Sequence, residues 1–357
     1  MALFTNFTPY AVGETVGTDA RGAEYYLVVV KATFSWDGRG VAYPLAEHQI
    51  VTEADVYAGP HGESSVVLET DFMPQKPRTD VVLLGAIELP AAVEQVDATL
   101  EVGRRIKKTA RVFGDRLYMP TLFGGSAPAR PRPFQRMPIV WERSFGGVDP
   151  ESAKAVELRN LVGVGMRHSM RSLEARPAPN FEDPRHLIDG WTSRPPPMGF
   201  GPIGRSWQPR AQLAGTYDAK WEDERYPLFP LDFNPLYFNC APQDQQLDGY
   251  LPGEEVRLTY MTRLGHERFL LPAFGVEVKF LDRRANATTA VTSVDTVVIE
   301  PAERRFSLIS RALHYPKPNV LSLRQVRVGT PSRGWRRAND LGKRYLDFRR
   351  HKTGAAT

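Results

Sequence analysis

The chain has 357 residues, of which 42% are hydrophobic and 24% charged, so it can bury a sizeable core. Its formal net charge is +5, and seven Lys/Arg against two Asp in Gly334–Thr357 account for all of it. The remaining residues are formally neutral, so their bulk charge argues against a nucleic-acid-binding surface, and nucleic acid is not an expected partner.

Neither a secretory signal nor a membrane anchor is expected. The first residues lack a basic segment followed by an apolar one, and apolar runs stay far below the ~20 residues that span a bilayer. Cys240 is the only cysteine, so no intrachain disulfide can form, which is typical of a reducing cytosol. We therefore expect a cytoplasmic bacterial protein without a membrane partner.

The first third of the chain predicts antiparallel strands. Tyr25–Phe34 is long, β-branched and aromatic, as a central strand would be, and Val81–Leu84 is expected to form a buried strand. Val96–Val102 alternates apolar and polar residues, and glycine-containing turns lead from it into Ile106–Phe113 and then Arg116–Met119. This pattern predicts a meander with one face in water.

The segment Phe123–Arg136 predicts a structural boundary. It holds two glycines, three prolines and three arginines without periodicity, as linkers do. We expect residues 1–125 to form an N-terminal β-rich lobe and residues 137–330 to form a second one, with an irregular aromatic and proline-rich segment. Residues 331–357 would be a basic C-terminal helix or tail.

The second half of the chain predicts a short strand at Ile139–Arg143, two short helices within Trp207–Glu224, and an amphipathic helix at Asn339–Arg350. Further strands, two of them joined by a turn at Glu300–Glu303, are expected at Val256–Met261, Val276–Phe280, Val291–Ile299, Arg305–Ile309 and Val320–Val328. Together these elements predict a mainly β fold of antiparallel sandwich or barrel-like sheets, in one or two lobes, with a few short helices.

The motifs associated with catalysis are weak. Gly199–Gly204 has the spacing G-x-G-x-x-G, but Pro195–Pro197 precede it and Pro202 lies inside it, so a structural turn is favoured over a nucleotide site. Ser126 and Ser144 both lack the sequence context of a hydrolase nucleophile. We expect neither catalytic residues nor a cofactor.

A metal site is not expected either, because no two histidines have the spacing of a zinc helix and Cys240 has no C-x-x-C partner. Cys240 is expected to be a buried small side chain rather than a thiolate. A cluster of His and carboxylate groups formed only in three dimensions stays open. The rival function is accordingly a hydrolase whose site is assembled from Asp, Glu and His in residues 137–240.

Lys76, Arg78 and Asp80 are the first candidates for partner contacts, because they lie in a proline-rich turn before an apolar strand. The turn could present fixed charges to a partner, or a local Arg78–Asp80 pair could simply close it. Trp141, next to an acidic and a basic residue, could be an interface hot spot or a core side chain. Its neighbours Glu142 and Arg143 complete this second group of candidates.

The third group of candidates is aromatic and lies within Tyr226–Phe238. Three prolines interrupt this segment, so it is expected to form an irregular and rigid wall, either in the core or as a docking groove. A rigid surface loses little entropy when it binds. The candidates within it are Tyr226, Phe229, Phe233 and Tyr237.

Several of these segments together resemble one protein family: Leu27–Phe34, Thr70–Gly85, Met137–Gly147, Asn160–Gly165, Phe229–Pro242 and Pro252–Leu258. The chain resembles, from about Leu27 to about Ile299, a bacterial domain-of-unknown-function family encoded beside type VI secretion effectors. Members of that family serve as effector adaptors or chaperones. The basic segment after Val328 lies outside the resemblance.

The resemblance implies a non-enzymatic cytoplasmic protein that binds a secreted effector. The contact would be made through the effector's spike-tip domain, of the proline-alanine-alanine-arginine type. The protein would then help to load this cargo onto the trimeric spike, which is a second implied partner. The family offers no catalytic residues to transfer, so its motifs are expected to determine folding or docking.

Overall fold

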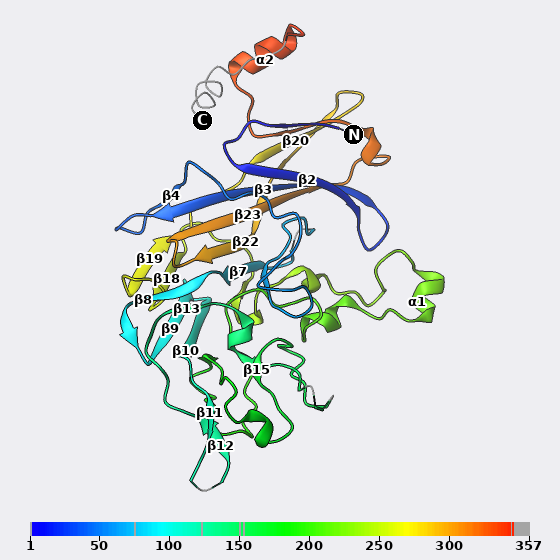
Figure 1. The fold of residues 1–357 in the computed structure, drawn as a ribbon. Coiled ribbons are helices and arrows are strands. Elements are labelled where there is room, and N and C mark those ends of the chain that lie inside the picture. Colours follow the sequence, from blue (N-terminus) through cyan, green and yellow to red (C-terminus); the bar gives the residue numbers. More distant parts are fainter. Residues whose placement is uncertain are drawn as a thin grey trace.

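A computed structural model describes residues 2–74, 76–122, 124–149, 151–152, 154–343 and 345. The predicted mainly β fold is confirmed (Figure 1). Its centre is a seven-stranded sheet that contains, in spatial order, β17 (Gln246–Leu247), β7 (Thr79–Leu83), β22 (Ser293–Glu300), β23 (Arg305–His314), β3 (Glu24–Trp36) and β2 (Ala11–Thr18), with β4 (Ala42–Pro44) also paired to β3.

Two smaller sheets accompany this central sheet. A five-stranded sheet has the order β16 (Phe181–Glu182), β10 (Ile106–Phe113), β9 (Gln95–Val102), β18 (Glu255–Thr259) and β19 (His266–Leu270). A four-stranded sheet has the order β1 (Leu3–Asn6), β24 (Leu323–Val328), β20 (Glu277–Asp282) and β21 (Ala287–Val291).

The remaining strands form two-stranded pairs. They are β5 (Val56–Tyr57) with β6 (Val66–Leu68), β8 (Ala86–Val93) with β13 (Phe134–Pro138), β11 (Tyr118–Pro120) with β12 (Ser126–Pro128), and β14 (Phe145–Gly146) with β15 (Val164–Gly165). The α-helices are α1 (Ala219–Glu224) and α2 (Arg333–Asp340). Short 3-10 helices are η1 (Trp141–Arg143), η2 (Arg171–Leu173), η3 (Arg210–Ala214), η4 (Pro235–Phe238), η5 (Gln243–Gln245) and η6 (Val320–Ser322).

Strand β3 is the spine of the central sheet. Its apolar run is flanked along most of its length by antiparallel β2 and β23, and its residues are buried on both faces of the sheet. Since successive side chains of a strand point to opposite faces, such a run needs cover on both sides. Figure 1 shows β3 and β23 side by side in the middle of the molecule.

The two smaller sheets cover the same face of the central sheet. Even-numbered β3 residues from Ala32 to Trp36 pack with the five-stranded sheet, and those from Tyr26 to Val30 pack with the four-stranded sheet. On the opposite face, odd-numbered residues such as Leu27 and Val29 pack instead against Cys240 and neighbouring loop residues. The sheet is therefore the middle layer, and loops rather than a sheet close its second face.

The predicted boundary near Phe123–Arg136 does not separate the sheets. The central sheet pairs β7 with β22, and the five-stranded sheet pairs β9 with β18, so both take strands from residues 1–125 and 137–330. The segment itself contains β12 and most of β13, which pairs with β8. The linker was predicted from the local composition of this segment. Pairing between strands that are far apart in sequence leaves no trace in local composition.

Most predicted strands lie within a few residues of the observed ones, and the two short helices predicted within Trp207–Glu224 are η3 and α1. The strand predicted at Ile139–Arg143 is wrong, because Trp141–Arg143 forms η1. No helix of the described residues is long and apolar enough to cross a membrane.

The C-terminal helix begins earlier than predicted. Helix α2 spans Arg333–Asp340, because the Ser332 side chain caps it by accepting a hydrogen bond from the Trp335 backbone N–H. Trp335 packs edge-on against Phe7, with ring centroids 4.8 Å apart, which attaches the helix to the body. Of the helix predicted at Asn339–Arg350, residues 344 and 346–350 lie outside the described residues.

Phe306→Ala is expected to reduce the free energy of unfolding by about 3–5 kcal/mol, the usual cost of removing a buried aromatic ring. The Phe306 ring is fully buried and stacks with Phe34 and Phe269, with centroid distances of 5.4 and 4.6 Å, so it joins the central and five-stranded sheets. Urea unfolding would measure the change. Val291→Ala, at an exposed position of β21, serves as the control and should change little.

Candidate functional site

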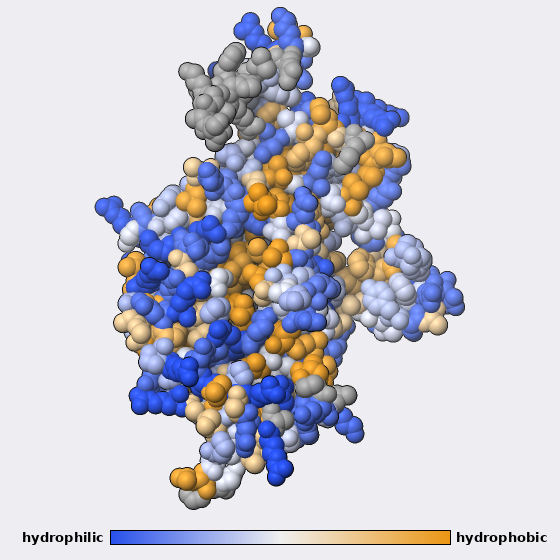
Figure 2. Space-filling model, viewed as in Figure 1, coloured by the Kyte–Doolittle hydropathy of each residue, from blue (hydrophilic) through white to orange (hydrophobic). Residues whose placement is uncertain are grey.

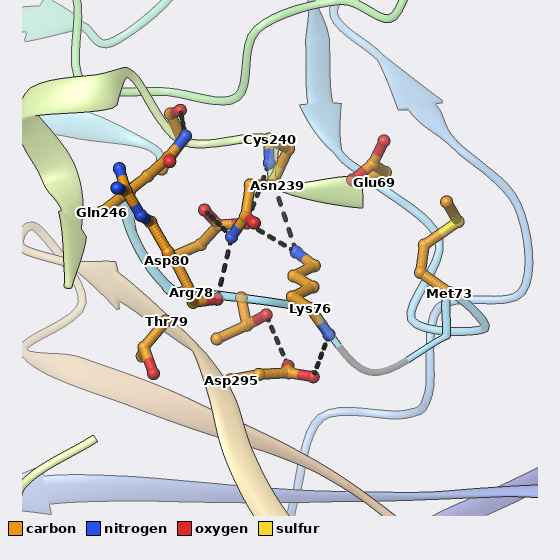
Figure 3. A network of polar contacts seen from close by, with 12 residues as sticks. Glu69, Met73, Lys76, Arg78, Thr79, Asp80, Asn239, Cys240, Gln246 and Asp295 are labelled. Carbon is orange, nitrogen blue, oxygen red and sulfur yellow. Dashed lines mark hydrogen bonds and ion pairs between the residues drawn. The ribbon is translucent and has the colours of Figure 1, made fainter. Parts of the chain in front are cut away.

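The turn that contains Lys76, Arg78 and Asp80 belongs to a buried polar network on the loop-covered side of the central sheet (Figure 3). The Lys76 ammonium lies 2.7 Å from the Asp80 carboxylate. The same carboxylate accepts hydrogen bonds from the Cys240 backbone N–H at 2.8 Å and from the Asn239 side-chain amide at 3.0 Å. Asp80 therefore ties the turn to residues 239 and 240, far along the chain.

Three further buried ion pairs surround this centre. Lys31 on β3 pairs with Asp71 at 2.9 Å, Arg311 on β23 pairs with Asp295 on β22, and Arg210 on η3 pairs with Glu69. Asp295 lies at an irregularity in the β22–β23 register and also accepts a hydrogen bond from the Lys76 backbone N–H. Four buried cations thus pair with four buried carboxylates in one region, and the half-buried Arg205 adds a second cation at Glu69 and pairs with Asp55.

Electrostatics holds the central pair in its charged form. Burial by itself would raise the pKa of Asp80, but Lys76 and the hydrogen bonds from Cys240 and Asn239 outweigh it and hold that pKa below its ordinary value. Burial would lower the pKa of Lys76, and the Asp80 carboxylate raises it instead. Burial raises the pKa of the Cys240 thiol well above its ordinary value, so this thiol is not a reactive thiolate.

Of this first group of candidates, only Arg78 has a partly exposed side chain, and it lies 3.4 Å from Asp248. Lys76 and Asp80 are buried, so they hold the fold and are not open to a partner in this structure. The Arg78–Asp80 pair that would have closed the turn is not formed, because Asp80 binds Lys76 and the Arg78 carbonyl accepts a hydrogen bond from Asn239.

Trp141 is a core side chain. It is 5% exposed, and its indole N–H donates to the Pro202 carbonyl at 2.8 Å. The ring lies edge-on to Trp207, and a Cβ on Gly199 would come within 2.8 Å of it. Gly199 and Gly204 therefore leave room for tryptophan rings, and Gly199–Gly204 does not lead directly into a regular helix.

Glu142 and Arg143, which follow Trp141, line an open cleft of about 730 Å³. Both carboxylate oxygens of Glu142 accept hydrogen bonds from Ser65, and Arg143 donates to Asp115 at 2.8 Å and to Asn180 at 3.0 Å. The cleft is lined by Asp115, Arg116, Leu117, Met119, Ala129, Arg130, Arg132, Val140, Glu142, Arg143, Val164, Pro177, Ala178 and Asn180. The residues that line it come from five separate stretches of the chain.

The predicted aromatic wall belongs to a projecting segment, residues 216–238, which we call the aromatic arm. Helix α1 lies at its end in Figure 1, and Figure 2 shows apolar and hydrophilic residues side by side on it. Tyr226 is 70% exposed, Phe229 and Phe233 are half-buried and stacked with centroids 4.2 Å apart, and Tyr237 is half-buried. Only the last aromatic residue, Phe238, is fully in the core.

The arm has a fixed base. Thr216 donates hydrogen bonds from its backbone N–H and its hydroxyl to Asp232, at 3.0 and 2.8 Å. These bonds join the beginning of the aromatic arm to its returning part. Arg225 donates to the Ala20 carbonyl at 2.8 Å, which attaches the arm to the turn between β2 and β3. An exposed aromatic surface is therefore held on a braced segment.

A three-dimensional His and carboxylate cluster, which the sequence left open, is formed by Asp149, Glu151 and His168. The Asp149 carboxylate accepts hydrogen bonds from the Glu151 N–H and from the backbone and Nδ1 of His168, at 3.0, 2.7 and 2.6 Å. Burial by itself would raise the pKa of Asp149, but these hydrogen bonds lower it to about 2. Both Asp149 oxygens are already engaged, so a divalent ion would have to displace these donors.

Sequence reasoning missed the partners that complete the buried network, among them Glu69, Arg210 and Asp295. A signal was present for some of them, since Lys31, Asp295 and Arg311 are charged residues inside otherwise apolar strands. A charge at such a position implies a buried partner. The partner itself could not be named, because every one of these pairs except Lys76–Asp80 joins residues that are far apart or on different elements.

The fold and these surfaces define a mainly β protein in which loops are fixed onto a central sheet by buried charges. Residues 21–311 match a family described as an uncharacterized protein conserved in bacteria, DUF2169, and the chain belongs to this family. Membership in a bacterial family of unknown function, which the motifs predicted, is thereby confirmed. No curated protein and no solved structure matches the chain.

Lys76→Met and Asp80→Asn are each expected to lower the free energy of unfolding at pH 7 by about 3–5 kcal/mol, because removal of one partner leaves a buried group uncompensated. The double variant should lose less than the sum of the two single losses. Chemical denaturation of all four proteins would measure this. Additive losses would contradict the buried pairing.

The loss caused by Asp80→Asn should depend on pH. Because the folded-state pKa of Asp80 is depressed, its ionised form stabilises the protein above the unfolded value of about 3.9, and this stabilisation disappears as pH falls toward the folded value. The difference between Asp80→Asn and wild type should therefore shrink below about pH 4. A difference that stays constant with pH would show that the carboxylate charge is not involved.

Trp141→Ala is expected to reduce the free energy of unfolding by about 3–5 kcal/mol, because the ring is buried and its N–H has a buried acceptor. Urea unfolding would measure the loss, and Trp221→Ala on the arm, where the indole is only partly buried, is a matched tryptophan control. Normal stability with loss of partner binding would instead identify Trp141 as a contact residue.

Proposed function

We propose that this protein is a non-enzymatic adaptor or chaperone that binds a type VI secretion effector in the bacterial cytoplasm and aids its loading onto the spike complex. The partner would be engaged through its spike-tip domain, and the trimeric spike is a possible second partner. The resemblance of several segments to effector adaptors motivates the proposal. The observation that carries it is the braced aromatic arm.

The physical properties of the arm suit protein binding. Tyr217, Tyr226 and Leu231 are 53%, 70% and 81% exposed, and large apolar groups exposed together mark interaction surfaces more often than isolated ones do. Aromatic residues are enriched in the centres of interfaces. Since hydrogen bonds close the base of the arm, its ordering on binding costs little conformational entropy.

Among the candidate contacts, the exposed and half-buried residues keep this role in the proposal. They are Arg78, Glu142, Arg143, Tyr226, Phe229, Phe233 and Tyr237. Lys76, Asp80 and Trp141 support the surface from below, because all three are buried. An adaptor must also release its cargo, so a limited set of anchors on a rigid frame is consistent with moderate affinity.

The rival function, a hydrolase, has one supporting observation. Asp149, Glu151 and His168 lie within residues 137–240 and come together around one buried carboxylate. A hydrolase that used this cluster would lose activity in the variant Asp149→Asn, whereas the adaptor would keep its binding. Hydrolase activity that disappears with this change would replace the adaptor proposal.

The double variant Tyr226→Ala/Leu231→Ala is expected to weaken partner binding at least about tenfold, because it removes two exposed anchors of the arm. The tagged protein would be recovered from its native bacterium, and size-exclusion chromatography with light scattering would give the composition of the complex. The control is Tyr43→Ala/Leu321→Ala, which removes the same residue types at exposed positions outside the arm.

A discrete complex with a toxin or spike component that the arm variant loses and the control keeps would support the proposal. A wild-type protein that elutes alone, or an arm variant that retains its partner in full, would contradict it.

A further inference from the structure

Strand β2 forms a free edge of the central sheet. It pairs with β3 on one side, from Ala11 to Thr18 and without a register shift, and no other described strand pairs with it. Figure 1 shows it at the end of the row β22, β23, β3 and β2. A strand edge of this kind carries unpaired backbone N–H and C=O groups, which another extended chain can bind.

The ladder between β2 and β3 shows which residues of β2 turn their backbone groups outward. In the turn that follows β2, the Asp19 N–H donates to the Ala23 carbonyl at 3.0 Å. Residues 19 and 23 are therefore a hydrogen-bonded pair, and in an antiparallel ladder such pairs alternate with pairs that are not hydrogen-bonded. The register then turns the N–H and C=O groups of Val12, Glu14 and Val16 away from β3.

These outward groups have almost no partners. Among the described residues, the one contact is from the Thr15 hydroxyl to the Val16 carbonyl, at 3.5 Å, which is at the limit of a hydrogen bond. Strand β2 also contains no lysine, proline or bulge, the features that commonly protect an edge from pairing. The backbone of β2 is therefore open to an added strand.

Glu14 lies in the middle of this edge with an unmatched charge. Its side chain makes no hydrogen bond or ion pair with any residue that the structure describes, and its Oε2 atom is buried. Burial raises the pKa of Glu14, since no cation compensates for it. A charge on an edge strand discourages pairing with most strands, but it favours a strand that places Lys or Arg opposite it.

Apolar side chains flank Glu14 on the same face of the sheet. Val12 and Val16 lie two residues before and after it, and alternate residues of a strand share a face. Val16 is 53% exposed, and Val12 is half-buried against the core. Because residues directly opposite each other in neighbouring strands are in contact, an added strand would match this edge with an apolar, a basic and an apolar residue at alternate positions.

The edge ends beside the aromatic arm. Arg225 of the arm donates to the Ala20 carbonyl in the turn after β2, at 2.8 Å. A Cβ on Gly22 in the same turn would lie 3.4 Å from Leu228 of the arm, which is ordinary contact. A partner bound to the arm is therefore next to the end of β2.

We propose that β2 binds an extended segment of the partner protein by strand addition, with apolar, basic and apolar side chains opposite Val12, Glu14 and Val16. The inference deepens the proposed adaptor function and rests on it for the identity of the partner. It differs from the arm in chemistry, since main-chain hydrogen bonds and one carboxylate hold the segment.

A defined peptide tests the inference. The probe is fluorescein-labelled Thr-Val-Thr-Lys-Thr-Val-Thr, and its matched probe has Glu in place of Lys. Fluorescence anisotropy with the full-length protein should show binding of the lysine peptide and at least about fivefold weaker binding of the glutamate peptide, because like charges directly opposite each other repel. Equal binding of the two peptides, or no binding of the lysine peptide, would overturn the inference.

Backbone methylation separates strand addition from a contact of side chains alone. In the added strand, the lysine N–H faces β2 and the N–H of each adjacent threonine faces away. N-methylation of the lysine backbone should weaken binding at least about tenfold, whereas N-methylation of an adjacent threonine should leave it nearly unchanged. Equal effects at the two positions would overturn strand addition.

Glu14→Lys is expected to reverse the preference, so that the glutamate peptide binds more tightly than the lysine peptide. Glu277→Lys is the matched control, because Glu277 is an exposed glutamate on β20, which has strands on both sides. This control should keep the wild-type preference, and thermal unfolding would verify that both variants fold. A Glu14→Lys protein with the wild-type preference would overturn the assigned contact.

Three further outcomes are decisive. A wild-type dimer in light scattering that the lysine peptide converts to a monomer would identify a second copy of this chain as the occupant and overturn a partner segment. If the arm variant loses the native partner while the lysine peptide fails to bind, the adaptor function stands and the inference on β2 fails. If wild type recovers no secretion partner, the adaptor function fails, and the peptide titration still decides whether β2 accepts a strand.

Discussion

The structure depends on the burial of charge against the second face of the central sheet. Lys31 and Arg311 project from neighbouring strands β3 and β23 into a region without solvent, and each needs a carboxylate there. Asp71 and Asp295 supply these carboxylates, and Lys76 with Asp80 and Arg210 with Glu69 complete the set. Loops take the place of a covering sheet on this face because buried ion pairs fix them.

This constraint also explains why the conspicuous motifs are not exposed. The charges of the turn before β7 belong to the buried network, in which Lys76 binds Asp80. The large ring of Trp141 in η1 fills the space beside Gly199. Both support surfaces formed by their neighbours. Arg78, Glu142 and Arg143 lie next to these buried residues and reach solvent, so the rigid interior sets where the exposed groups stand.

Two exposed surfaces of the protein, the aromatic arm and the cleft beside Glu142 and Arg143, differ in shape and chemistry. The aromatic arm projects from the body and is braced by hydrogen bonds at its base and at the β2–β3 turn. The cleft is concave, and apolar side chains line it together with arginines that are largely paired with acidic residues.

The sequence by itself determined the β character of the chain and the position of most strands, because alternation and β-branched runs such as that of β3 are local properties. It also predicted an irregular segment at Tyr226–Phe238, since the prolines there restrict the backbone. Only the tertiary structure decided which strands pair and that Trp141 and Asp80 are buried. The contacts that bury these residues join distant parts of the chain: Asp80 binds Cys240, 160 positions away, and Trp141 binds Pro202, 61 positions away. No local sequence pattern records such contacts.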